Sequence, residues 1–342
     1  MKKRKKLRVA VLMHPSTVPP EDPDNYSERE AYEWKTEFDV MTTLRKLGHE
    51  VQAVAVRDEL SPIRTAIEEW QPDIVFNLLE EFLGRQEFDH HVVSYLEMMQ
   101  VAYTGCNPRG LMLTRDKALS KKLLAFHHMV VPKFAVYERG QRVHRPKHLE
   151  FPLIVKSLTH EASLGISQAS IVEGDEKLRE RVAFVHQRNG TDAIVEQYIE
   201  GREFYAGIIG NRRKEVLPVW ELVFENMPPG AVSIATAHVK HDPEYQRRRG
   251  IYQQHADNLP PEILEYINRT TKRVARLLDL DGYGRVDYRL GADGKLYFLE
   301  ANPNPDIAKS EEFASAAEQA GTAYPQLIQK VLDLGLRRAA GR

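Results

Sequence analysis

The sequence predicts a chain of several domains, with a parallel α/β unit first and α+β units after it. Over the first hundred residues, apolar strand-like runs alternate with amphipathic helix-like stretches, a pattern typical of a parallel sheet with helices on its faces. Beyond residue 112 this alternation ends, and strand-like segments follow one another more closely. The chain has 342 residues, which is more than one compact domain usually contains and is enough for several domains.

The first unit, residues 1–112, is expected to contain a βαβαβ run. Strands are predicted at residues 9–13, 51–56 and 73–79, with helices at residues 32–47 and 61–70. In open parallel sheets, ligands usually bind at the carboxyl ends of the strands. The polar stretch at residues 15–30 is long for a connection, and it is either a mobile surface loop or a loop that reaches a site.

Two further units are expected, at residues 113–196 and 197–342. The central unit is predicted to contain helices at residues 114–126 and 175–187 and strands at 134–137, 152–156 and 193–198. The last unit is predicted to contain strands at residues 203–210, 284–290 and 295–301 and helices at 261–278 and 324–336. The turn Gly291-Ala292-Asp293-Gly294 joins two of these strands into a hairpin.

Composition narrows the classes of partner. Lys and Arg number 48 and Asp and Glu 49, a balance that does not favour nucleic-acid binding. No apolar run is long enough to cross a bilayer, and the basic residues 1–6 lead directly into a short strand rather than a secretory leader. The single cysteine, Cys106, excludes an intramolecular disulfide and fits a reducing compartment. We therefore expect a cytoplasmic protein that does not act at a membrane.

The C-terminal hairpin carries the strongest candidate metal site. Strand alternation places Asp287 on one face of the first strand, and Glu300 and Asn302 on one face of the second. If the turn pairs the strands in register, these three side chains converge. Two carboxylates and an amide oxygen suit Mg²⁺, which fills its octahedron with phosphate oxygens and water. The alternative is a solvated hairpin face on which Arg285 and Arg289 pair with the carboxylates.

Other segments supply the remaining parts of a nucleotide site. Lys117, Lys156 and Lys240 are available to bind phosphates, although a lysine at a strand end such as Lys156 can also be an ordinary surface side chain. The loop at residues 157–165, which contains Ser163, is small and polar enough to close over a polyphosphate as a mobile lid.

A strand, turn and strand lie between Glu196 and Glu203. The backbone of this segment, around Tyr198 and Ile199, could contact a purine edge, while the two carboxylates bind the amino group and the ribose hydroxyls. No Walker signature is present, and the isolated Gly282-x-Gly284 is too weak to indicate a dinucleotide fold.

Taken in order, these segments resemble the D-alanine:D-alanine ligase branch of the ATP-grasp superfamily over nearly the whole chain. The matching stretches are Asp73-Ile74-Val75-Phe76-Asn77, Tyr103-Thr104-Gly105, Asp116-Lys117, Pro152-Leu153-Ile154-Val155-Lys156, Val195-Glu196, Gly201-Arg202-Glu203-Phe204, Gly284-Arg285-Val286-Asp287 and Glu300-Ala301-Asn302. The resemblance implies a three-domain ATP-grasp architecture, in which the two later α+β units clasp ATP. It also implies ATP and Mg²⁺ as cofactors and a homodimer formed through the N-terminal domain.

The resemblance also implies residue roles and a reaction. Lys117 and Lys156 would bind the α- and β-phosphates, Glu196 the adenine amino group, Glu203 the ribose, and Lys240 the γ-phosphate. The metal would be bound by Asp287, Glu300 and Asn302. ATP would convert a carboxylate into an acyl phosphate, which an amine attacks while Arg285 stabilises the oxyanion.

The substrate pocket departs from the family pattern. The loop after the first strand is His14-Pro15-Ser16-Thr17-Val18-Pro19-Pro20 instead of a glycine-rich segment, and Ala162 and His241 replace a serine and a tyrosine. Asp306 stands where a glycine is expected, and Glu311-Glu312 where a serine-leucine pair is expected. The acidic candidates for substrate contact are Glu80, Glu81, Asp306, Glu311 and Glu312.

We therefore expect a ligase that acts on small amino-acid or peptide-like substrates other than D-alanine. The acidic candidates would repel an anionic acceptor and favour a cationic one, unless they point to solvent or pair with Arg85 and Lys309. The alternatives are a D-alanine:D-alanine ligase of cell-wall synthesis and a nucleotide-binding regulatory protein without ligase activity. The regulatory protein is disfavoured because a protein that only binds a nucleotide would not need all the residues expected to act in phosphoryl transfer, which are Lys240, Arg285, Asp287, Glu300 and Asn302.

Overall fold

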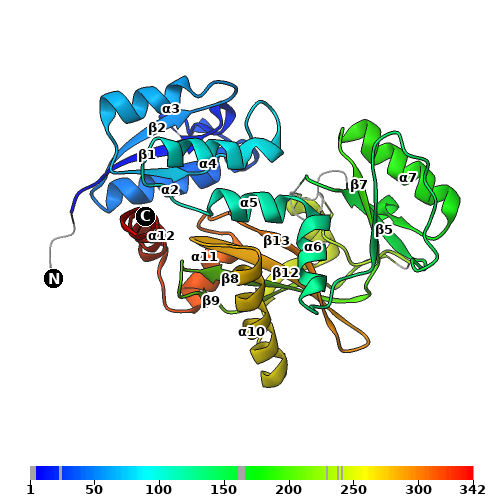
Figure 1. The fold of residues 1–342 in the computed structure, drawn as a ribbon. Coiled ribbons are helices and arrows are strands. Elements are labelled where there is room, and N and C mark those ends of the chain that lie inside the picture. Colours follow the sequence, from blue (N-terminus) through cyan, green and yellow to red (C-terminus); the bar gives the residue numbers. More distant parts are fainter. Residues whose placement is uncertain are drawn as a thin grey trace.

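The computed structural model describes residues 5–22, 25–160, 166–228, 230–236, 239 and 242–341, and the strands within these ranges form three sheets (Figure 1). The N-terminal sheet is parallel, with strand order β2-β1-β3. Its strands are β1 (Arg8–Met13), β2 (Glu50–Ala55) and β3 (Ile74–Asn77). The predicted βαβαβ run is confirmed, with strand bounds shifted by one or two residues.

Helices cover both faces of this sheet. They are α2 (Lys35–Lys46), α3 (Ser61–Thr65) with a π-helical continuation (Ala66–Trp70), and α4 (Asp89–Met98). Val9, Val11 and Met13 of β1 share a core with α2, whereas Ala10 and Leu12 share the other core with α3 and α4. Because successive side chains of a strand point to opposite faces, β1 is buried on both sides.

The last helix, α12 (Tyr324–Ala340), returns to the N-terminal sheet. Leu327, Ile328 and Val331 join the same core as Val9 and Val11 of β1. Figure 1 shows this helix beside the N-terminal unit, although it ends the chain.

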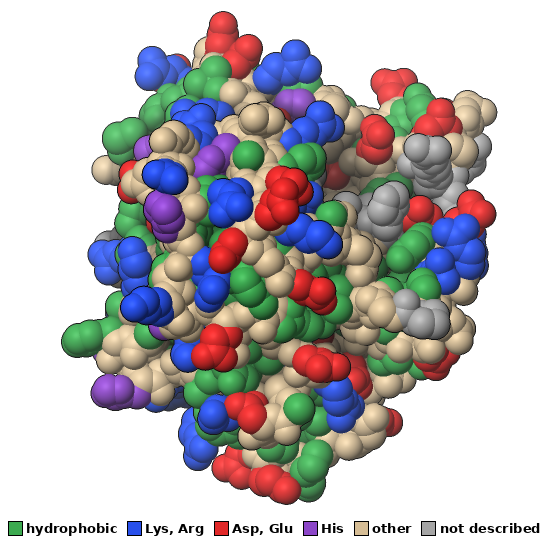
Figure 2. Space-filling view, turned by 90° about the vertical axis from the view of Figure 1, so that its right-hand side faces the viewer, with side chains coloured by type: hydrophobic (Ala, Val, Ile, Leu, Met, Phe, Trp, Pro, Cys, Tyr) green, Lys and Arg blue, Asp and Glu red, His purple; other side chains and the backbone are tan. Residues whose placement is uncertain are grey.

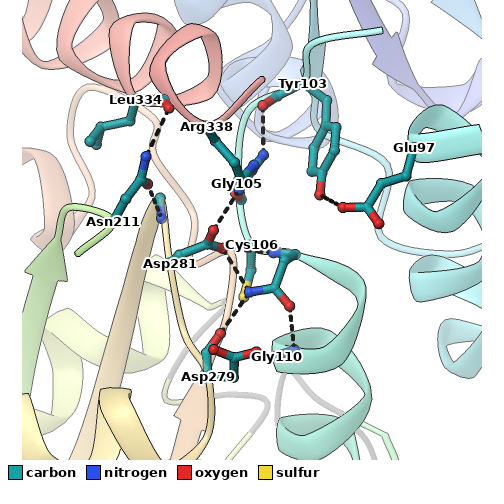
Figure 3. A network of polar contacts seen from close by, with 12 residues as sticks. Glu97, Tyr103, Gly105, Cys106, Gly110, Asn211, Asp279, Asp281, Leu334 and Arg338 are labelled. Atoms are coloured by element: carbon teal, nitrogen blue, oxygen red, sulfur yellow. Dashed lines mark hydrogen bonds and ion pairs between the residues drawn. The ribbon is translucent and has the colours of Figure 1, made fainter. Parts of the chain in front are cut away.

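A polar network fixes the end of α12 (Figure 3). The Arg338 guanidinium donates to the Tyr103 and Gly105 carbonyls, both at 2.7 Å, and pairs with Asp281 at 3.1 Å. Asn211 donates to the Leu334 carbonyl at 3.0 Å. These contacts join the segment after β3, the turn before β12 and the last helix.

The central sheet is antiparallel, with strand order β4-β7-β5-β6. Its strands are β4 (Phe134–Tyr137), β5 (Leu153–Ser157), β6 (Ile171–Val172) and β7 (Ala193–Gln197). Helix α7 (Asp175–Arg188) packs on one face through Leu178, Val182 and Val185. The predicted helix at residues 114–126 is wrong in one respect, because the segment forms two helices, α5 (Pro108–Arg115) and α6 (Lys117–Phe126). Asp116 separates them, and its carboxylate caps α6 by accepting from the Ala118 and Leu119 amides.

The C-terminal sheet is antiparallel, with strand order β11-β10-β8-β12-β13, and β9 pairs with β8. Its strands are β8 (Gly201–Ile209), β9 (Glu215–Val216), β10 (Trp220–Phe224), β11 (Ile251–His255), β12 (Tyr283–Gly291) and β13 (Leu296–Asn302). Helix α10 (Pro261–Leu277) covers one face, where its Ile267 and Val274 pack with Phe204 and Val286. The other face of β8 and β12 carries Glu203, Tyr205 and Asp287 and belongs to the candidate site.

The remaining helical elements are short or were not predicted. They are α1 (Glu28–Ala31), α9 (Pro243–Arg249), α11 (Glu312–Gln319) and the 3-10 turns η1 (Pro15–Thr17), η3 (Tyr32–Trp34), η5 (Gln86–Phe88) and η6 (Gln168–Ser170). None of the helices in the described ranges is both long and apolar enough to cross a membrane. On the face drawn in Figure 2, acidic and basic side chains are interspersed.

Candidate active site

A β-bulge in the C-terminal hairpin aligns the predicted metal ligands. Near the turn, Leu290 pairs with Leu296 and Tyr288 with Phe298, so a regular ladder would next place Leu299 opposite Asp287. Instead the register shifts after Tyr288, and Asp287 pairs with Glu300 and Arg285 with Asn302. The bulge therefore puts Glu300 and Asn302 on the face of Asp287 and Arg285. The predicted convergence is correct, but it depends on a shift that alternation alone does not predict.

Arg285 is held on this face by two carboxylates. Its guanidinium donates to both oxygens of Asp287, at 2.7 and 2.9 Å, and also pairs with Glu312. The guanidinium carbon lies 4.7 Å from the centre of the Tyr205 ring. All four side chains are at least largely buried, so the orientation of Arg285 is fixed by ion pairs and ring stacking.

The first half of the candidate nucleotide pocket is built around Glu196. This carboxylate is 1% exposed and pairs with Lys121 at 2.9 Å and with Lys156 at 3.2 Å. Burial raises the pKa of Glu196, but the two lysines outweigh burial and hold the pKa below its usual value. Burial lowers the pKa of Lys121, and Glu196 opposes that effect. Lys121 also donates to the carbonyl of Leu299, the residue at the bulge, and so connects β7 with β13.

The second half is built around Glu203. Arg289, on the neighbouring strand, pairs with Glu203 and donates to the Ile199 carbonyl at 3.2 Å and to the Ser233 carbonyl at 3.0 Å. The Tyr205 hydroxyl donates to Glu203 at 3.0 Å. Glu203 is therefore oriented by a buried arginine and a buried tyrosine before any ligand binds.

A small pocket of about 60 Å³ lies between these two halves. Its walls come from β5, β7, the 198–199 turn, β8 and the hairpin, and they include Lys156, Glu196, Tyr198, Ile199, Glu203, Asp287 and Glu300. Lys117 lies near the end of the pocket formed by the hairpin, with its ammonium 3.8 Å from Glu300 and 2.7 Å from the His160 carbonyl. The structure thus brings together eight predicted residues, counting Lys117 with the seven wall residues.

Some predicted residues lie outside the described ranges. They are Ser163 and Lys240, together with Ala162 and His241 and most of the predicted lid at residues 157–165. The phosphate roles of Ser163 and Lys240 therefore stay predictions.

The buried charges that orient the pocket were not predicted from the sequence. Lys121 was passed over, although it lies one helical turn after Lys117 and such spacing places both on one face of α6. From the sequence, Arg289 is expected only as part of an alternative hairpin face. No feature of the sequence near Arg289 predicts that it pairs with Glu203 on the neighbouring strand β8.

A larger cavity, of about 600 Å³, begins two residues further along the same hairpin face. Arg285 and Asn302 line it, as do Glu80, Asp306, Glu311 and Glu312. A neighbouring cavity of about 390 Å³ shares Glu80 and Asp306 and adds Glu81, Glu37 and the 14–17 loop. All five acidic candidates thus line cavities next to Arg285, and the polar loop after β1 reaches a cavity wall.

Of the alternatives for the acidic candidates, exposure to solvent holds for Glu80 and Asp306, whereas the described contacts of Arg85 and Lys309 are with other residues. Arg85 pairs with Glu87, at 3.7 Å, and the Lys309 amide donates to Asp39. Glu81 instead lies 3.8 Å from His14, and Glu311 lies 3.5 Å from Lys35.

Electrostatic crowding is strongest around Glu311. Burial raises the pKa of Glu311 to about 7, with added contributions from Asp306 and Glu312 that Lys35 opposes. Desolvation also raises the pKa of Asp306, which is exposed only within the cavities that it lines. The Tyr32 hydroxyl has its pKa raised to about 12 by burial and by the carboxylates of Glu311, Asp306 and Glu312. The carboxylates in this part of the cavity therefore lie close enough to oppose one another's ionisation.

Comparisons with known proteins decide the family. The family model described as "D-ala D-ala ligase C-terminus" matches residues 123–333, more than half of the chain. The chain belongs to the D-alanine–D-alanine ligase family. A D-alanine–D-alanine ligase from Nitratidesulfovibrio vulgaris is 30% identical over 324 residues, covering 90% of this chain and 97% of that protein. An uncharacterized protein, y4sG, from Sinorhizobium fredii is 31% identical over 311 residues, covering 88% of each chain.

Solved structures show the same fold. The D-alanine–D-alanine ligase from Bacillus anthracis in complex with ATP has a TM-score of 0.76 and 21% identity, covering 98% of this chain and 99% of that one. The ligase from Coxiella burnetii has a TM-score of 0.72 and 15% identity, covering 99% of this chain and 96% of that one. The expected family resemblance and the ATP-grasp fold class are confirmed. The expectation of an ATP-dependent enzyme that forms a carbon–nitrogen bond is confirmed at the level of the D-alanine–D-alanine ligase family.

Proposed function

We propose that this protein is an ATP- and Mg²⁺-dependent carboxylate-amine ligase that acts through an acyl phosphate on a substrate other than D-alanine. One observation carries the proposal: the hairpin face lies between two cavities. Asp287 and Glu300 line the small pocket, whereas Arg285 and Asn302, paired with each other across the same strands, line the large cavity. A phosphoryl group held in the small pocket would meet a carboxylate held in the large cavity at this face.

The charged side chains around the small pocket suit the parts of ATP, and the pocket of about 60 Å³ would have to widen to admit the whole nucleotide. A buried carboxylate between two lysines at one end and a carboxylate oriented by Arg289 at the other offer separate partners for an adenine amino group and a ribose. Lys117 and Lys156 would bind phosphate oxygens, the roles that the family resemblance implies for them. The ATP complex of the Bacillus anthracis ligase, which has the same fold, supports this part of the proposal.

The residues of the hairpin fit Mg²⁺. Within the described ranges, no three His, Cys, Asp or Glu side chains are grouped to hold a metal, so a metal site formed by protein ligands alone is not among them. Two carboxylates and an amide suit a cation that takes its other ligands from phosphates and water. When bound, ATP supplies the phosphoryl group and Mg²⁺ offsets its charge.

The side chains of this protein would then act on the carboxylate substrate. Asp287, Glu300 and Asn302 would hold the metal, and Lys117 and Lys156 would hold the phosphates. A carboxylate oxygen of the substrate would bond to the γ-phosphorus of ATP as the bond to ADP breaks, which releases ADP. In the resulting acyl phosphate the C–O bond to phosphate would break as the amine forms the C–N bond, which releases phosphate and a proton. Arg285, fixed by Asp287 and Glu312, would stabilise the negative charge on the carbonyl oxygen during the attack.

The walls of the large cavity argue against D-alanine as the acceptor. Its described cationic side chains, Arg115 and Arg285, are already paired with carboxylates. A free amino-acid carboxylate placed there would meet Asp306, Glu311 and Glu312, and each like-charge contact near 4 Å costs about 1 to 4 kcal/mol. A D-alanine–D-alanine ligase of cell-wall synthesis is the second candidate, because the curated relatives carry that name.

The proposal is tested by a screen for phosphate release. The full chain is incubated with ATP, Mg²⁺ and pairs of carboxylates and amines, and the products are identified by mass spectrometry. We expect amide formation with an acceptor other than D-alanine. Efficient D-alanyl-D-alanine synthesis would contradict the substrate claim, and ATP binding without turnover for any pair would favour a regulatory role.

A further inference from the structure

The acidic cavity beside Arg285 carries a further inference, which rests on the proposed function and concerns the substrate of the same site. Three carboxylates line this cavity near Arg285: Asp306, Glu311 and Glu312. Among the described residues, two cations contact this group. Arg285 pairs with Asp287 and Glu312, and Lys35 lies 3.5 Å from Glu311. The group therefore has more carboxylates than cations, with Glu312 buried, Glu311 partly buried and Asp306 exposed.

Asp306 is the best placed of these carboxylates to contact a ligand. It accepts from the Thr36 hydroxyl at 2.7 Å and from the Ala308 amide at 2.8 Å, which fix its orientation without a positive charge. It lines both the 600 Å³ cavity and the neighbouring cavity of about 390 Å³. A cation bound between Asp306 and Glu311 would thus lie where the two cavities meet.

The start of α11 closes the same end of the cavity. The exposed amides at a helix N-terminus favour anions, but here the N-cap residue and the first helical residue are themselves Glu311 and Glu312. The carboxylates of Glu311 and Glu312 thus take the place at the helix N-terminus where a substrate anion would otherwise be stabilised. A substrate carboxylate would have to displace or neutralise them.

The outer wall of the cavity has a different character. Trp220, Leu222 and Ile251 line it beside Tyr252. Leu222 and Ile251 belong to a small apolar cluster against which Trp220 packs. Apolar and aromatic walls suit a methylene chain, and aromatic faces also attract cations.

From this arrangement we propose that the acceptor is an amine with a second positively charged nitrogen on an apolar chain and no carboxylate beside the reacting nitrogen. Asp306 and Glu311 would bind the second nitrogen. The reacting nitrogen would lie toward Arg285 and Asn302, where the acyl group is transferred.

The test measures binding and does not depend on turnover. Calorimetric titrations of the full chain, with and without Mg²⁺ and a non-hydrolysable ATP analogue, compare 1,4-diaminobutane, n-butylamine, 4-aminobutyrate and D-alanine. We expect the diamine to bind at least tenfold more tightly than n-butylamine, because the two differ by one charged nitrogen. The two zwitterions should bind more weakly than n-butylamine.

Neutral variants assign the effect to particular side chains. Glu311→Gln and Asp306→Asn should each weaken diamine binding at least fivefold and change n-butylamine binding less. Glu318→Gln, on the exposed side of the same helix, should leave both unchanged. If Asp306→Asn does not fold, Glu311→Gln alone decides.

Three outcomes would overturn the proposal: no binding of the diamine, equal binding of a zwitterion, or diamine binding that neither variant affects. Failure of the ligase proposal has a different signature. In that case no amine stimulates phosphate release, whereas the binding preference for the diamine can still be measured.

Discussion

Glu196 illustrates how single residues build the nucleotide pocket. From the sequence, Glu196 is expected to be one of two carboxylates that bind the adenine amino group and the ribose. The structure adds that it is fully buried with two lysines, one of which, Lys121, is 0% exposed. Buried ion pairs of this kind are costly to break, because the surviving partner keeps its charge without compensation.

Replacement of Glu196 by glutamine should therefore reduce stability as well as nucleotide binding. Glu196→Gln leaves the charges of Lys121 and Lys156 buried, and we expect the free energy of unfolding to fall by about 3 kcal/mol. Urea denaturation measures it, with the exposed Glu200→Gln as control. A loss below about 1 kcal/mol would mean that solvent already reaches these charges.

Glu311 gives a prediction about pH. Its pKa is raised to about 7, so its side chain is mostly protonated below pH 7 and gains its negative charge as the pH rises through 7. The groups facing it are Lys35 and Tyr32 from the α2 side, Asp306 from the loop after β13, and Glu312 from α11.

The affinity for a diamine should accordingly increase about tenfold between pH 6 and pH 8. Calorimetric titrations across this range measure the increase. The same titrations on Glu311→Gln should give a flatter profile, and an equally steep profile in that variant would show that another group titrates.

At the scale of elements, the hairpin was predictable and its register was not. The alternation of Arg285, Asp287 and Arg289 predicts one face of β12 correctly. The shift that pairs Asp287 with Glu300 depends on a bulge at Leu299, whose carbonyl accepts from Lys121 on another unit. Strands β10 and β11 were missed because their residues, such as Trp220 to Phe224, lack clear alternation and pair only within the assembled sheet.

Strand β8 depends on a close approach of backbones at its first residue. Gly201 has φ +154°, and a Cβ there would lie 2.0 Å from the Leu290 carbonyl oxygen. Gly201→Ala should therefore lower the free energy of unfolding by at least about 2 kcal/mol, and it should weaken ATP binding because Glu203 follows two residues later.

Urea denaturation and nucleotide titration measure these two effects. Gly174→Ala is the matched control, because a Cβ there meets nothing within 4 Å and φ is negative. Equal effects of the two substitutions would contradict the close-approach argument.

At the scale of the molecule, α12 connects the first and last parts of the chain. The sequence predicts this helix from its amphipathic pattern but gives no signal that it covers the N-terminal sheet. That contact depends on matching Leu327, Ile328 and Val331 with β1, more than 300 residues earlier. The network at Arg338 was likewise invisible, because a single arginine near a helix end has no distinctive pattern.

Arg338→Met should loosen this connection. The Arg338 guanidinium is a shared partner of Asp281 and of the Tyr103 and Gly105 carbonyls, and the substitution removes it. We therefore expect a loss of about 3 kcal/mol in the free energy of unfolding. Arg337→Met changes an exposed neighbour and should cost little.

In the Arg338→Met variant, hydrogen exchange should be faster in both β1 and α12, and faster exchange in α12 alone would refute a shared core.

The most direct test of the account concerns the hairpin carboxylate at the meeting point of the two cavities. ADP formation with ATP, Mg²⁺ and an accepted carboxylate-amine pair is compared for the unmodified protein, Glu300→Gln and Glu265→Gln, which lies on the exposed side of α10. We predict that Glu300→Gln lowers turnover at least about a hundredfold while its melting temperature stays near that of the unmodified protein, because it removes one of the two charges that we propose hold the metal. Glu265→Gln should change neither quantity. Unchanged turnover in Glu300→Gln would contradict the assignment of this face as the site of phosphoryl transfer.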